Sequence, residues 1–146
     1  MKDLSVKSPA FESSKPIPKK YTCDGQDINP PLTIEGTPKE TKTLVLIVDD
    51  PDAPSGTFDH WIVWNIPSST GKIGENTVPG TEGMNGARQM GYFGPCPPSG
   101  THRYFFKFYA LDTELSLRVG SKKKDVEKAM QGHILAKGEL MGLYSR

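Results

Sequence analysis

The stretch that decides the fold of this chain is LVLIVDDPDAP, residues 44–54. Residues 44–48 form a continuous apolar run rich in β-branched side chains, which is typical of a strand buried on both faces. Pro51 and Pro54 lack the amide proton that a β ladder needs. We therefore expect a central strand that ends at Asp50 and opens into a loop carrying carboxylates.

Two further strands carry a histidine at one end. The run WIVWNI, residues 61–66, follows His60, and a strand over residues 104–111 follows His102. In this last strand the alternation of side chains predicts a core face made of His102, Tyr104, Phe106, Phe108 and Ala110. Two histidines and an acidic loop therefore lie at the ends of what we expect to be central strands, where a small-ligand site would be built.

The remaining chain predicts a β-rich protein. A strand is expected near residues 32–34, a helix over 122–131 with Ser121 as its N-cap, and a last strand over 133–144. Strands followed by one late helix favour a single β-rich domain over residues 1–146. The glycine-rich segment 67–91 has no clear element, and we expect it to wrap back across the site.

Composition narrows the class of partner. The 146 residues carry a net charge of +1, so bulk electrostatics favours neither nucleic acid nor an anionic membrane. No run reaches the roughly 18 to 20 apolar residues of a membrane span, and the N-terminus lacks the apolar core of a signal peptide. We expect a cytoplasmic protein with no membrane span and no cofactor.

The chain holds two cysteines, Cys23 and Cys96, far apart and without the spacing of a metal site. In a reducing cytosol the expectation is two separate thiols. A disulfide stays open as the alternative, because intracellular disulfides do occur in hyperthermophiles.

Three chemistries fit a cluster of Asp50 or Asp52 with His60 and His102. The histidines, helped by backbone amides of Gly94 and Gly100, make an anion pocket in the first, and a carboxylate orients one imidazole. In the second, the same side chains hold a metal ion. In the third, Ser55 or Ser99 acts as a nucleophile beside a His–Asp pair. Spacing alone leaves an anion pocket, a metal site and a purely structural loop open.

At this point the motifs resemble those of a known family. DPDAP (residues 50–54) and DHW (59–61) pair with GYFGPCPP (91–98) and HRYFF (102–106). This combination resembles the phosphatidylethanolamine-binding protein family, and within it the prokaryotic branch described as Raf kinase inhibitor-like. The similarity covers nearly the whole chain, in order.

The resemblance implies two packed antiparallel sheets with one or two short helices and an anion pocket at one end. It implies that the pocket takes phosphate or a phosphoethanolamine head group. The residues it assigns to the site are Asp50, Asp52, His60, Tyr92, Gly94, Pro95, His102 and Tyr104.

The resemblance also implies a ligand-binding protein and not an enzyme. Inhibition of a protein kinase or a serine protease, and homodimer formation, are properties of some relatives. A metal-dependent or nucleophilic hydrolase that uses the Asp/His/His cluster is the alternative function.

Overall fold

The computed structural model describes residues 2–146, which form two β-sheets and one α-helix. The large sheet has the order β1-β9-β8-β4-β5-β7, and β2, β3 and β6 make a small second sheet. All strand pairs are antiparallel except β1 with β9. The strands are β1 (Lys2–Asp3), β2 (Ser5–Lys7), β3 (Leu32–Glu35), β4 (Thr43–Asp50), β5 (Phe58–Pro67), β6 (Lys72–Ile73), β7 (Thr81–Glu82), β8 (Thr101–Leu111) and β9 (Ile134–Ser145). The expected β-rich fold of two packed sheets is confirmed.

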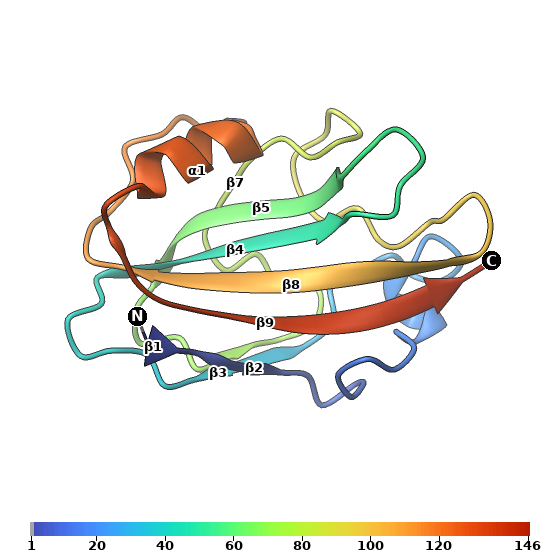
Figure 1. Cartoon of the computed structure of the whole chain (residues 1–146), viewed down its shortest axis with the longest axis horizontal. Coiled ribbons are helices and arrows are strands. Elements are labelled where there is room, and N and C mark those ends of the chain that lie inside the picture. The colour runs from blue at the N-terminus through green and yellow to red at the C-terminus, as the bar shows by residue number, and fades with distance from the viewer. Residues whose placement is uncertain (1) are drawn as a thin grey trace.

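Strand β4 is the centre of the large sheet, with β5 on one side and β8 on the other. All of its residues are buried, as the apolar run predicted. Because β4 ends at Asp50 where β5 begins at Phe58 and β8 begins at Thr101, the loops 51–57 and 92–100 meet at one end of the sheet (Figure 1).

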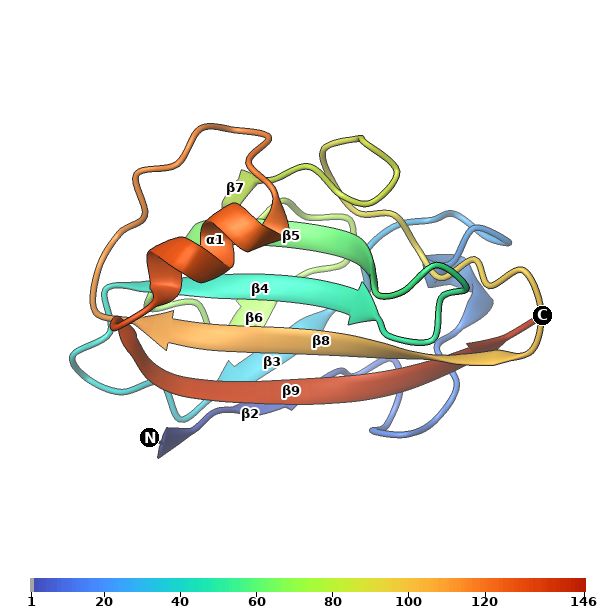
Figure 2. The same cartoon turned by 45° about the horizontal axis from the view of Figure 1, so that its top comes forward.

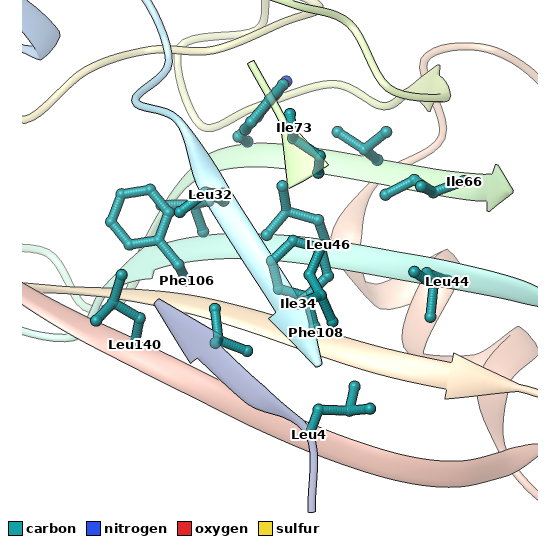
Figure 3. Packing of buried hydrophobic residues seen from close by; sticks show 14 of the residues in the cluster. Leu4, Leu32, Ile34, Leu44, Leu46, Ile66, Ile73, Phe106, Phe108 and Leu140 are labelled. Atoms are coloured by element: carbon teal, nitrogen blue, oxygen red, sulfur yellow. The ribbon is translucent and has the colours of Figure 1, made fainter. Parts of the chain in front are cut away.

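The main core lies between the two sheets (Figure 3). Leu44, Leu46 and Phe106 point from the large sheet towards Leu32 and Ile34 of β3. The predicted inner face of β8 is confirmed, because every second residue from His102 to Ala110 is buried. Burial of each large apolar side chain on this face, such as Phe106 and Phe108, stabilises the fold by about 1.5–3 kcal/mol before entropy is counted.

A second, smaller core lies on the other face of the large sheet. Val45 and Ile47 of β4 pack there with Val126 and Met130 of helix α1 (Lys123–Met130). Figure 2 shows α1 in front of the large sheet and the small sheet behind it. The helix was predicted within a residue at each end, but its N-cap is Lys122 and not Ser121. The Ser121 hydroxyl donates instead to the carbonyl of Arg118, 2.8 Å away.

The expectation for segment 67–91 is only partly met: the Gly86 amide donates to the Asp59 carbonyl at 2.8 Å, at the start of β5, but no residue of the segment lines the cavity described below. The segment forms β6 in the small sheet and β7 on the edge of the large sheet. A turn forms at Asn85, whose side-chain oxygen accepts the amides of Ala87 and Gln89. Within residues 2–146, no helix is both long and apolar enough to cross a membrane.

Candidate functional site

A small cavity lies at the end of the sheet where the two loops meet. Its volume is about 120 Å³, below the roughly 300 Å³ at which pockets for drug-sized molecules begin. Four polar side chains face it from three neighbouring strands: those of Asp50, His60, His102 and Tyr104. The rest of the wall is largely apolar and consists of Ala53, Pro54, Phe58, Phe93, Cys96, Pro97 and Pro98.

Asp50 fixes the imidazole of His102. Oδ2 of Asp50 lies 2.7 Å from Nδ1 of His102, and both residues are buried. Oδ1 of the same carboxylate accepts the backbone amide of Asp52 at 2.7 Å. The ring nitrogen that donates to an ionised carboxylate carries a proton, so Nε2 is the atom of His102 left for a ligand.

His60 is held in the same way by a different acceptor. Its Nδ1 donates to the carbonyl of Phe93, and its ring stands edge-on to Tyr104 with the ring centroids 5.2 Å apart. Burial lowers the pKa of His60 below its ordinary value, although the Phe93 carbonyl and the charge of Asp50 act in the opposite direction. His60 is therefore a neutral imidazole near pH 7 with Nε2 unprotonated.

The hydroxyl of Tyr104 is buried near the Asp50 carboxylate and the Cys96 backbone, and among the described residues it has no hydrogen-bond partner of good geometry. Burial, with the negative charges of Asp50 and Asp52 added, raises the pKa of Tyr104 well above its ordinary value, so the group stays protonated. A buried hydroxyl without a partner costs free energy unless a water or a ligand accepts its proton. The polar atoms that the cavity offers a ligand are therefore the two imidazole Nε2 atoms, with the Tyr104 ring beside them.

Asp52 and Tyr92 were predicted in the site but do not line the cavity. Asp52 forms a two-pronged pair with Arg103, with contacts of 2.9 Å to Nε and to Nη2. This guanidinium lowers the pKa of Asp52 to about 2. Tyr92 packs edge-on against Trp61, and its hydroxyl donates to the carbonyl of Tyr21 at 2.8 Å.

Gly94 and Pro95 also lie outside the cavity lining, because they hold the loop to the N-terminal part of the chain. The amide of Gly94, expected to face an anion, donates to Oδ1 of Asp27 at 2.8 Å. A Cβ at Gly94 would lie 2.2 Å from that oxygen, so the close approach that requires glycine is to Asp27 and not to a ligand. The Pro95 carbonyl accepts the amide of Cys23 at 3.1 Å.

The sequence did not predict the apolar half of the cavity wall. Phe58 precedes DHW directly, and Phe93 and residues 96–98 lie inside GYFGPCPP. Their place inside both motifs was the available signal. Hydrophobic residues in a proline-rich loop do not by themselves indicate ligand contacts, although small-molecule sites are mostly apolar.

Cys23 and Cys96 form a disulfide, so the expectation of two separate thiols is wrong. Their Cα atoms are 5.5 Å apart although 73 positions separate them in the sequence. The turn after residue 22 and the loop over 94–98 run side by side here, joined by the bond from the Cys23 amide to the Pro95 carbonyl. Because Cys96 lines the cavity, the disulfide is part of its wall.

The two alternative chemistries lack the arrangement of side chains that they need at this place. Across residues 2–146, no three His, Cys, Asp or Glu side chains are arranged as a metal-binding group. Neither Ser55 nor Ser99 lines the cavity beside the Asp50–His102 pair.

Comparisons with known proteins agree with this fold. The family model described as phosphatidylethanolamine-binding protein matches residues 7–145. A UPF0098 protein of Methanothermobacter thermautotrophicus is 49% identical, with 98% of this chain and 99% of that protein covered. Another, of Pyrococcus horikoshii, is 54% identical, with 98% of this chain and 78% of that protein covered.

Two crystal structures share the fold along the whole chain. A phosphatidylethanolamine-binding protein homologue of Chlamydia trachomatis superposes with a TM-score of 0.96 at 43% identity, covering 100% of this chain and 99% of the other. YbcL of E. coli, described as a member of the mammalian family, gives a TM-score of 0.90 at 26% identity, with 99% of each chain covered. With the family model, the relatives and the two-sheet fold all in agreement, the chain belongs to the phosphatidylethanolamine-binding protein family.

Proposed function

We propose that the protein binds a small, singly charged phosphate group, free or on a head group such as phosphoethanolamine, in the cavity between His60 and His102. The observation that carries the proposal is the pair of buried imidazoles, each fixed through Nδ1 and both lining one small cavity. Nε2 of each ring is then the atom that can bond an oxygen of the ligand.

The protonation of the two imidazoles decides which anion fits. Each ring uses Nδ1 for a fixed partner, so Nε2 of a neutral ring can accept a hydrogen bond but cannot donate one. A fully deprotonated phosphate would then meet no donor at the neutral His60 ring and would lie beside the carboxylate of Asp50. A phosphate that keeps a proton, or that brings one to an imidazole, makes complementary bonds. Binding is therefore accompanied by proton uptake, and affinity falls as pH rises.

The size and lining of the cavity support binding of a head group. About 120 Å³ has room for a phosphate but not for a whole lipid, and the apolar rim of Phe58, Pro97 and Pro98 lowers the local dielectric around hydrogen bonds to the ligand. We propose binding and not turnover, because neither Ser55 nor Ser99 lines the cavity to act as a nucleophile.

The test follows the imidazole resonances of the three histidines by NMR while phosphate or phosphoethanolamine is added. We expect His60 and His102 to shift together and saturably. His133 is the internal control, since it lies outside the cavity and pairs with Asp112 at 2.8 Å. Resonances of His60 and His102 that stay fixed, or that move no more than those of His133, would overturn the proposal.

Variants make the test quantitative. Loss of a hydrogen bond to a charged group costs about 1.5–3 kcal/mol, so His60→Gln or His102→Gln should weaken phosphate binding roughly 10- to 150-fold. His133→Gln should leave the affinity unchanged. Calorimetry in two buffers of different ionisation enthalpy should show proton uptake near pH 7; binding without proton uptake would exclude a protonated ligand or imidazole.

A further inference from the structure

The Cys23–Cys96 disulfide lies where a redox change would alter the cavity directly. Cys96 is a wall residue, and Cys23 belongs to the turn that packs against the 94–98 loop. Both cysteines are half-buried, so a small reductant in solvent has access to the bond. Reduction would place a thiol in the cavity wall close to the polar groups described above.

Arg146 lies closer to the sulfur atom of Cys96 than to that of Cys23. Its Nη1 lies 3.3 Å from Sγ of Cys96 and 3.9 Å from Sγ of Cys23. The residue is anchored, because its backbone pairs with that of Gly100 through hydrogen bonds of 2.9 and 3.2 Å. A guanidinium beside a cysteine favours the thiolate, which is the reactive form. After reduction the better stabilised thiolate is therefore that of Cys96.

The loop that carries Cys96 has other attachments. The Tyr92 hydroxyl donates to the Tyr21 carbonyl, the Gly94 amide to Asp27, and the Cys23 amide to the Pro95 carbonyl. These three bonds, at about 1 kcal/mol each, join the same two segments as the disulfide. We therefore expect the loop to stay in place after reduction, with the Cys96 sulfur still at the cavity.

We propose that Cys96 is a redox-controlled modification site in the cavity wall. When a dithiol reduces the Cys23–Cys96 disulfide, the free Cys96 thiol reacts with small thiol-directed electrophiles. The dithiol gives two electrons and two protons to the disulfide, leaving two cysteine thiols and a cyclic disulfide. Cys96 then loses its proton to solvent, beside Arg146. With iodoacetate, a sulfur–carbon bond forms as the carbon–iodine bond breaks and iodide leaves. We also expect an anionic electrophile such as iodoacetate to be preferred at Cys96, and only this expectation rests on the proposed anion binding.

The test measures the alkylation rate of each cysteine by peptide mass spectrometry, with and without prior treatment with dithiothreitol. The untreated protein should not react. In the reduced protein Cys96 should react faster than Cys23, by about threefold or more, because the gain in thiolate fraction exceeds the loss of nucleophilicity. Arg146→Gln should remove most of this difference. Arg118→Gln, which changes an exposed arginine outside the cavity, should leave it unchanged.

A second variant covers the case in which reduction unfolds the protein. In Cys23→Ser the Cys96 thiol is free without any reductant, and circular dichroism reports whether the fold is kept. Equal rates at the two cysteines of the reduced, folded protein, or a Cys96 rate in Cys23→Ser that Arg146→Gln does not lower, would overturn the proposal. The proposal would also be overturned if dithiothreitol does not reduce the disulfide in the folded protein.

Added phosphate separates this proposal from the proposed function. If phosphate slows the reaction of Cys96 with iodoacetate but not that of Cys23, both stand. If Cys96 reacts first and depends on Arg146, yet phosphate gives no protection, the modification site stands and the anion site fails. Iodoacetamide, which is uncharged, serves as the reference electrophile in each case.

Discussion

One carboxylate, that of Asp50, fixes both the ring of His102 and the start of the loop that follows β4. Its Oδ2 accepts a hydrogen bond from Nδ1 of His102, and its Oδ1 accepts one from the Asp52 amide, each at 2.7 Å. The cavity therefore depends on Asp50 for its shape as well as for its charge.

Asp50→Ala should lower the free energy of unfolding by about 1–3 kcal/mol, because two donors in a buried place lose their acceptor. Urea denaturation at pH 7 measures the change. Asp112→Ala is the matched control, since the Asp112–His133 pair is also joined through Nδ1, at 2.8 Å, but both side chains are more than 40% exposed. That variant should cost less than about 1 kcal/mol. Equal losses in the two variants would contradict the role given to burial.

The Asp52–Arg103 pair should stabilise the protein except in acid. Arg103 holds the pKa of Asp52 at about 2 in the folded state, against an ordinary value of 3.8. The pair's contribution is therefore complete above pH 3.8 and is lost as pH falls towards 2. Unfolding free energies of the native protein and of Asp52→Asn, measured from pH 6 to pH 2, should converge in acid. A difference that does not change with pH would show that the pair is energetically silent.

His60 should make the folded protein less stable below neutral pH. Burial lowers its pKa in the folded state, so the unfolded chain takes up a proton first as pH falls through about 6.5. The contribution of neutral His60 is complete above that pH and declines below it. His60→Gln should therefore reduce the slope of unfolding free energy against pH between 7 and 5. Parallel curves for the variant and the native protein would contradict a buried neutral imidazole.

Gly94→Ala should destabilise the protein through the Asp27 contact, not through the ligand. Its Cβ would lie 2.2 Å from Oδ1 of Asp27 and 2.7 Å from the Tyr21 carbonyl oxygen. Overpacking of this kind costs about 1–3 kcal/mol. In Gly71→Ala the nearest atom to the new Cβ is 3.9 Å away, so this control should be close to neutral. Thermal unfolding of both variants provides the comparison.

The sequence predicted best what depends on local periodicity. The buried run 44–48 and the alternation from His102 to Ala110 follow from the pleat of a single strand, and both agree with the observed burial. The meeting of Asp50, His60 and His102 was also foreseeable, because each lies at the end of a central strand that faces the same loops.

What the sequence did not predict depends on contacts between distant segments. Tyr92 and Gly94 lie in the second motif, yet their partners Tyr21 and Asp27 are 71 and 67 positions earlier, and these partners draw them away from the cavity. The disulfide has the same origin, since only the folded chain brings Cys23 beside Cys96. A local sequence pattern does not predict such long-range contacts.

The backbone pairing of Arg146 with Gly100 has a practical consequence for anyone who extends or labels this chain. Residues attached after Arg146 would emerge beside Cys96, at the edge of the cavity, and would compete with whatever enters it. Figure 1 shows the N-terminus at the opposite end of the large sheet. An affinity tag or a fluorophore placed at the N-terminus leaves the cavity open, whereas the same group at the C-terminus would alter the binding that is measured.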